Sequence, residues 1–279
     1  MREPIAVPLA PPTGMRDLLP PDAAARGALA GTLTATFASY GYQLVTTPPF
    51  EHAEVIERGL DTIDRRDLLR FVEPESGEVA LLRPDITPQI ARIVATRLAD
   101  RPPPFRLCYA GSLIRQRRGR ARTQRQIMQA GVEHLGPSSA PGQADAEVIA
   151  IAVEAARRTG LTALHLELHL VGLARAAIHE LPEASRDAAS AALSRKDRVE
   201  LEAIVRRAGA DRAAGRRLAR ASELYGELSL LEEARRVFPG REARAALDEL
   251  EAVASKLAGM GVAGGGLELS VDLGEVRGT

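Results

Sequence analysis

The side chains best suited to chemistry are Arg115, Gln129 and Glu133, which lie within one stretch, residues 105–136. Two runs of strand-like composition flank an arginine-rich turn in this stretch. Side chains two or four residues apart on a strand share a face, so Gln129 and Glu133 are expected to point the same way. A guanidinium that faces a carboxylate and an amide suits a small zwitterion carrying a carboxylate or a phosphate. The pattern therefore predicts a polar pocket on one face of a strand pair.

The elements around this pair predict an α+β fold. Strands alternate with helices, and hairpin-type links favour an antiparallel sheet flanked by helices over a Rossmann fold. Thr87 is expected to be a helix N-cap with Pro88 in the first position. A helix opened by Pro20, Pro21 and Asp22 is expected to bury one apolar stripe. The stripe consists of Leu29, Leu33, Phe37 and Tyr40. The other predicted strands are 42–47, 68–72, 79–82, 164–170 and 267–272, and a further helix is predicted over 144–158.

The chain changes character near residue 172. From there to residue 257 it is rich in alanine, leucine, arginine and glutamate at helical spacing, which predicts a helical insertion. The predicted organisation is a first part over 1–171, the insertion over 172–258, and a return strand over 259–279.

Bulk composition narrows the function classes. The 279 residues hold 37 basic and 37 acidic side chains, so net charge gives no argument for nucleic acid or a membrane surface. Cys108 is the single cysteine, no apolar run reaches the roughly 20 residues of a membrane span, and no signal peptide is evident. The histidines lack metal-ligand spacing. We predict a cytoplasmic protein with no metal, no cofactor, and no membrane or nucleic-acid partner.

Three further strings stand out beside residues 105–136. They are Pro11-Pro12-Thr13-Gly14-Met15-Arg16-Asp17-Leu18-Leu19-Pro20, Leu82-Arg83-Pro84-Asp85-Ile86-Thr87-Pro88-Gln89-Ile90 and Val271-Asp272-Leu273-Gly274-Glu275-Val276-Arg277-Gly278. Together with 105–136, these strings resemble motifs of the class II aminoacyl-tRNA synthetases, most closely those of the histidyl-tRNA synthetases and their paralogues, the regulatory subunits of ATP phosphoribosyltransferase.

The resemblance implies a histidine pocket and a class II synthetase-like fold. Asp85 takes the place of the acid that holds the amino group of histidine, and Arg115 matches the motif 2 arginine. The residues carried over to the pocket are Asp85, Thr87, Arg115, Gln129, Glu133 and Arg277. One departure matters: the enzymes have Phe-Arg-x-Glu in motif 2, with the glutamate near the adenine amino group, whereas this chain has Ile114-Arg115-Gln116-Arg117.

By this resemblance the chain is a regulatory subunit of ATP phosphoribosyltransferase without catalytic residues of its own. It would assemble with the short-form catalytic subunit, support the first step of histidine biosynthesis and confer feedback inhibition by histidine. A homodimer is expected through residues 13–40, the motif 1 region. The sequence stops before motif 3, which suggests truncation. The alternatives are a fragment of histidyl-tRNA synthetase and a protein with neither role. The arginine-rich turn is either a solvated loop or a contact for tRNA phosphate or a nucleotide.

We predict that the purified chain forms no histidyl-adenylate. A guanidinium carries only donors, so Arg117 cannot accept the hydrogen bond that the adenine amino group offers to the glutamate of the enzymes. Histidine-dependent ATP–pyrophosphate exchange should stay at background while an intact histidyl-tRNA synthetase, assayed alongside, exchanges. Exchange above background would favour the alternative hypothesis, that the chain is a fragment of histidyl-tRNA synthetase.

Overall fold

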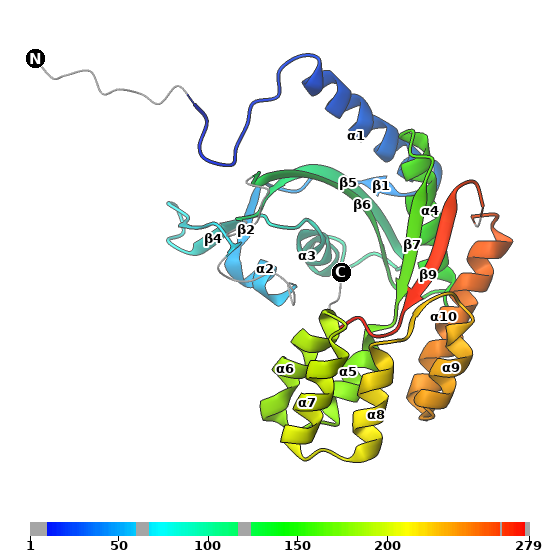
Figure 1. The fold of residues 1–279 in the computed structure, drawn as a ribbon. Helices are drawn as coiled ribbons and strands as arrows, with labels where there is room; N and C mark the ends of the chain where they lie inside the picture. The colour runs from blue at the N-terminus through cyan, green and yellow to red at the C-terminus, as the bar shows by residue number, and fades with distance from the viewer. Residues whose placement is uncertain (1–9, 60–66, 117–123, 263, 277–279) are drawn as a thin grey trace, which may run out of the picture. The chain divides into compact units, whose positions relative to one another are not determined.

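The computed structural model describes residues 10–59, 67–116, 124–262 and 264–276. The chain forms two compact units, one of Met1–Pro137 with Glu154–Thr159 and the other of Ser138–Val153 with Gly160–Thr279. Each unit has its own sheets and helices (Figure 1).

The first unit contains two three-stranded sheets. One has the order β1-β5-β6, with β1 parallel to β5 and β5 antiparallel to β6, and the other is the antiparallel sheet β2-β4-β3. The elements are α1 (Asp22–Ser39), β1 (Gln43–Leu44), β2 (Phe50–His52), α2 (Ala53–Arg58), β3 (Arg70–Val72), β4 (Val79–Leu82), α3 (Thr87–Thr96), β5 (Phe105–Ile114) and β6 (Gln126–Leu135).

The long hairpin β5–β6 has a helix on each face. Leu107 and Tyr109 form a core cluster with Ile86 and Ile90 from the start of α3. On the opposite face, Arg26 of α1 donates to the Ser112 hydroxyl at 2.6 Å. Figure 1 shows α3 within the curve of the hairpin and α1 along its outer side. Odd-numbered side chains of β5 therefore face α3, where the predicted pocket lies.

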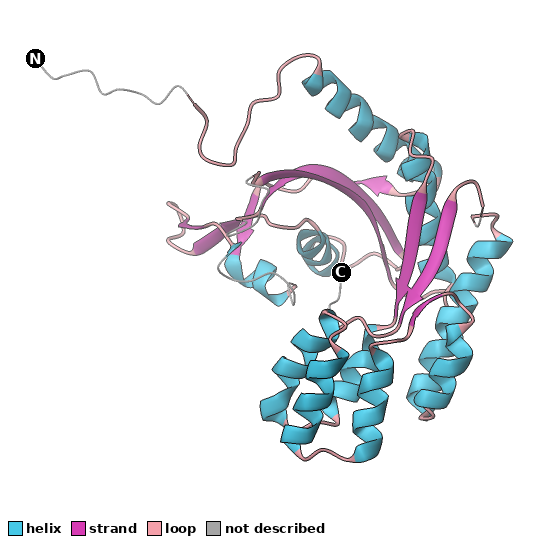
Figure 2. Ribbon diagram, in the orientation of Figure 1, coloured by secondary structure: helices cyan, strands magenta, loops and turns pink. Residues whose placement is uncertain are grey.

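The second unit is mostly helical (Figure 2). Its sheet has the order β7-β9-β8, with β7 parallel to β9 and β8 antiparallel to β9. The elements are α4 (Gln143–Arg158), whose last residues belong to the first unit, β7 (Leu164–His169), α5 (Val171–His179), α6 (Glu183–Ser194), α7 (Arg198–Ala208), α8 (Arg212–Ala221), β8 (Tyr225–Gly226), α9 (Leu230–Val237), α10 (Arg241–Gly259) and β9 (Leu267–Asp272).

One apolar core joins the helices of the second unit. Each helix from α5 to α10 contributes a leucine that is at most 3% exposed, and burial of such a side chain stabilises a fold by about 1.5–3 kcal/mol. The leucines are Leu173, Leu193, Leu201, Leu218, Leu231 and Leu247. Side-chain caps set two helix starts, because Asp197 accepts from the amide of Glu200 and Asp211 from that of Ala213.

The α+β class is confirmed, and the predicted strands 79–82 and 267–272 match β4 and β9. The boundaries 1–171, 172–258 and 259–279 remain a prediction. No helix in the described part of the chain is long and apolar enough to cross a membrane.

Four local predictions were wrong. The expected stripe on α1 buries Phe37, but Leu29 is 47% and Tyr40 40% exposed. Thr87 is the first residue of α3 after the N-cap Ile86, and it makes no cap hydrogen bond, because its hydroxyl donates to Glu133 instead. The strand predicted over 42–47 is only the two residues of β1, and the helical segment after residue 172 contains the short strand β8.

We predict that Gly266→Ala destabilises the second unit much more than Gly261→Ala. Both glycines have positive φ, +81° and +69°, which costs an alanine about 1–2 kcal/mol. A Cβ on Gly266 would also lie 2.1 Å from the Thr162 carbonyl oxygen, whereas one on Gly261 meets nothing within 4 Å. Thermal unfolding should show a drop of about 2–8 °C for Gly261→Ala and at least twice the measured drop for Gly266→Ala. Equal drops would show that the contact at Gly266 relaxes freely.

Candidate functional site

Asp85, in the loop between β4 and α3, gathers three donors. Its Oδ2 pairs with Nη2 of Arg115 at 2.9 Å, and its Oδ1 accepts from Nε2 of Gln129 at 3.1 Å and from the amide of Thr87 at 3.0 Å. Nε of Arg115 donates to the Pro84 carbonyl at 2.6 Å, so the guanidinium holds both the side chain and the backbone of this loop. Charge-assisted bonds of this type are roughly twice as strong as neutral ones.

Gln129 ties the same loop to β6. Its Oε1 accepts from the amide of Ile86 at 3.0 Å while its Nε2 donates to Asp85. Gln129 lies opposite Gly111 in the hairpin register, on the face that α3 covers. The side-chain amide of Gln129 therefore forms hydrogen bonds with both a carboxylate and a backbone N–H of the loop.

Glu133 is the second acidic residue of the site. Its Oε1 accepts from the Thr87 hydroxyl at 2.7 Å and from the Tyr109 hydroxyl at 3.3 Å. Within the described part of the chain, no donor reaches Oε2, which leaves that oxygen available to a ligand. Tyr109 fits because Gly131 lies opposite it: a Cβ there would lie 2.8 Å from the tyrosine oxygen.

Burial shifts the ionisation of this pair. Desolvation raises the pKa of Glu133 above its ordinary value, and the negative charge of Asp85 raises it further, while the hydroxyls of Thr87 and Tyr109 oppose the shift. The pKa of Tyr109 is raised too, first by burial and then by the charges of Glu133 and Asp85. Among the described residues, the network contains two acids and the one arginine that pairs with Asp85, and a nearby cation would favour the ionised form of both acids.

Five of the six predicted site residues meet in one hydrogen-bonded network in the first unit: Asp85, Thr87, Arg115, Gln129 and Glu133. Arg277 and Arg117 lie outside the described residues. Sequence reasoning missed Tyr109. The strand register that brings it opposite Gly131 is not visible in the sequence.

In the part of the chain that the structure describes, no three histidine, cysteine or acidic side chains group closely enough to hold a metal ion. His165 and His169 of β7 have other partners. Nε2 of His165 lies 2.7 Å from the Ser270 hydroxyl, and Nε2 of His169 lies 2.6 Å from Glu167.

Comparison with known proteins shows which class of fold this chain has. Residues 14–279 match the histidyl-tRNA synthetase family. A Bacillus halodurans structure, described as an ATP phosphoribosyltransferase regulatory subunit/histidyl-tRNA synthetase, superposes with a TM-score of 0.84 at 28% identity, over 98% of this chain and 70% of that one. Histidyl-tRNA synthetase from Nostoc gives a TM-score of 0.76 at 19% identity, over 98% and 62% of the two chains, which shows the fold alone. The fold is that of the class II aminoacyl-tRNA synthetases.

Comparison with individual relatives shows which group within this family the chain belongs to. The ATP phosphoribosyltransferase regulatory subunit of Anaeromyxobacter dehalogenans is 42% identical over 272 residues, which are 96% of this chain and 75% of the relative. The subunit of the same name in Geobacter sulfurreducens is 36% identical over 277 residues, 99% of this chain and 62% of the relative. The chain therefore belongs to the ATP phosphoribosyltransferase regulatory subunits, within the histidyl-tRNA synthetase family.

We predict that Glu133→Gln changes how stability depends on pH. The raised pKa of Glu133 means that the folded chain binds this proton more tightly than the unfolded chain does. The wild type therefore loses stability as pH rises above about 4.3, the ordinary glutamate value, until Glu133 is ionised in the folded state too. A glutamine keeps an acceptor for Thr87 and Tyr109 without that penalty.

Urea denaturation between about pH 4 and pH 8 should show the variant gaining on the wild type as pH rises. Glu54→Gln, at a side chain that is 73% exposed, serves as control and should give a nearly constant difference. A Glu133→Gln difference that is flat or falls with pH would contradict the argument.

Proposed function

We propose that this chain is a non-catalytic regulatory subunit of ATP phosphoribosyltransferase that binds histidine in the Asp85–Glu133 network. It assembles with the short-form catalytic subunit, supports the first step of histidine biosynthesis and confers feedback inhibition by histidine. The names of the relatives support the regulatory role. The observation that carries the histidine proposal is the convergence of two acids, an arginine, an amide and two hydroxyls on one face of the hairpin.

The chemistry of the network matches a zwitterion with a polar ring. Arg115 supplies a cation for the carboxylate of histidine, and Asp85 supplies an anion for its ammonium group. Glu133, with its available Oε2, supplies an acceptor for an imidazole N–H, and Gln129 offers an amide on the same face. Arg277 is proposed as a further member, carried over from the family motif.

A catalytic role fits the residues less well. Arg117 stands where the enzymes have the glutamate near adenine, and Pro88-Gln89 after Thr87 is the form of the regulatory paralogue. A fragment of histidyl-tRNA synthetase remains the alternative. We further propose a homodimer through residues 13–40, which the exposed side chains of Leu29 and Tyr40 on α1 support.

The pocket is tested by histidine titration calorimetry on Asp85→Ala and Glu133→Ala. Loss of one charged partner costs about 1.5–3 kcal/mol, so each variant should bind histidine roughly ten- to a hundred-fold more weakly. Glu54→Ala removes an acid of the same unit from an exposed ion pair with Arg58 and should bind as the wild type does.

The same variants, mixed with the short-form catalytic subunit, report on regulation. Wild-type chain should co-sediment with that subunit and make its phosphoribosyl transfer sensitive to histidine, and Asp85→Ala should co-sediment without conferring this sensitivity. Unchanged histidine affinity and unchanged inhibition in both variants would contradict the proposal that Asp85 and Glu133 bind histidine. Failure to co-sediment would remove the partner assignment.

A further inference from the structure

A short segment, residues 47–51, lies against both ends of the loop that carries Asp85 and Thr87. We call this segment the strap. It leads into β2 and is separated from the loop by more than thirty residues of sequence, as the contact between Thr47 and Arg83, 36 residues apart, shows.

The first end of the loop is held by Arg83. Its Nη1 donates to the carbonyl of Thr47 at 2.9 Å, to the hydroxyl of Thr47 at 2.7 Å and to the carbonyl of Pro48 at 3.1 Å. Its Nε donates to the Ser112 carbonyl on β5 at 2.7 Å. Arg83 is only 9% exposed, and burial lowers its pKa. Gly111 leaves room for this guanidinium, because a Cβ there would lie 2.7 Å from Nη2.

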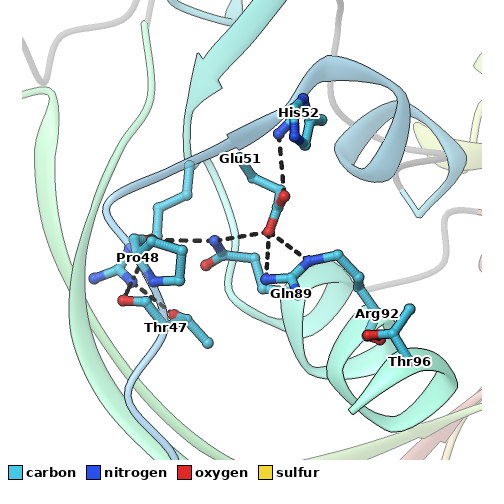
Figure 3. A network of polar contacts seen from close by, with 8 residues as sticks. Thr47, Pro48, Glu51, His52, Gln89, Arg92 and Thr96 are labelled. Carbon is cyan, nitrogen blue, oxygen red and sulfur yellow. Dashed lines mark hydrogen bonds and ion pairs between the residues drawn. The ribbon is translucent and has the colours of Figure 1, made fainter. Parts of the chain in front are cut away.

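The second end is held from α3. Gln89, fully buried, donates from Nε2 to the carbonyl of Pro48 at 3.0 Å. Arg92 places both Nε and Nη2 at 2.7 Å from Oε2 of Glu51, which is 6% exposed. Figure 3 shows Glu51, Gln89 and Arg92 converging beside Pro48.

Both ends of the loop are thus hydrogen-bonded to the same backbone carbonyl. The oxygen of Pro48 accepts from Arg83, which precedes the loop, and from Gln89, which follows it. Residues 84–87 therefore lie between two residues, Arg83 and Gln89, that are both hydrogen-bonded to the strap. Gln89 keeps this place although its Oε1 has no hydrogen-bond partner in the described part of the chain, a cost that an apolar residue would avoid.

We infer that Glu51 is a positioning residue for the site: through Arg92 and the first turn of α3 it holds Asp85 and Thr87 where Arg115, Gln129 and Glu133 reach them. The inference rests on the proposed histidine pocket for its functional part. Its structural part stands on the contacts alone. Glu51 is buried and Arg92 only partly so, and removal of the Glu51 charge leaves the guanidinium of Arg92 without its partner in this pair, so the effect of a change at Glu51 passes to Arg92.

Hydrogen exchange at two amides tests the structural part on the full chain. The amides of Ile86 and Thr87 donate to Gln129 and Asp85, so they report directly on the loop. In Glu51→Gln these two amides should exchange about tenfold faster or more, while the β5–β6 ladder keeps its wild-type rates. Glu54→Gln, three residues along in an exposed pair, should leave all of these rates unchanged.

Arg92→Lys gives a second, milder variant. It keeps the charge but replaces the two contacts with Glu51 by one, so it should speed exchange at Ile86 and Thr87 by less than Glu51→Gln does. Unchanged exchange at these amides in both variants would overturn the inference. An equal rise in the β5–β6 ladder would also overturn it, because Glu51 would then serve only the general stability of the unit.

Histidine calorimetry tests the functional part. If the wild type binds histidine, Glu51→Gln should bind it about tenfold more weakly, with Glu54→Gln as control, and unchanged affinity would overturn the positioning of the pocket. If the wild type binds no histidine, the proposed function fails by itself, and the exchange rates at Ile86 and Thr87 still decide whether Glu51 positions the loop.

Discussion

The carboxylate of Asp85 is the point at which three distant stretches of the first unit meet. It accepts from Arg115 after β5, from Gln129 on β6 and from the amide of Thr87 at the start of α3. A partly buried carboxylate without donors would cost several kcal/mol, so each of these stretches is constrained by the others. The register of the hairpin, the position of α3 and the conformation of the loop are linked through one charged group.

Among the described residues, the network holds two acids and one arginine that pairs with an acid. Asp85 and Glu133 both accept from Thr87, and Arg115 pairs with Asp85. The pKa of Glu133 is raised mainly by burial, and the negative charge of Asp85 raises it further. A cationic group placed beside the two carboxylates would favour their charged forms. Groups with a shifted pKa of this kind are common at functional sites.

Much of this arrangement was predictable from sequence, and the rest was not, for physical reasons. Strand alternation correctly placed Gln129 and Glu133 on one face, because a period of two depends only on local geometry. Tyr109 was missed because its place in the network needs the cross-strand register. The N-cap prediction at Thr87 failed because a tertiary acceptor, Glu133, took its hydroxyl. The strap was not visible either, since Glu51 and Arg92 are 41 residues apart and no local pattern joins them.

Anchoring the loop at both ends has a consequence for how a ligand would enter. The oxygens of Asp85 already have protein donors, so a ligand ammonium must share or displace the bonds from Arg115 or Gln129. Those donors sit on side chains, whereas the backbone of the loop is fixed through Arg83 and Gln89 to the carbonyl of Pro48. Exchange of partners is therefore confined to side-chain rotation, which costs far less than reordering backbone. The contacts that hold the backbone of the loop are therefore separate from the side-chain contacts of Asp85, so the side-chain contacts can change while the loop keeps its shape.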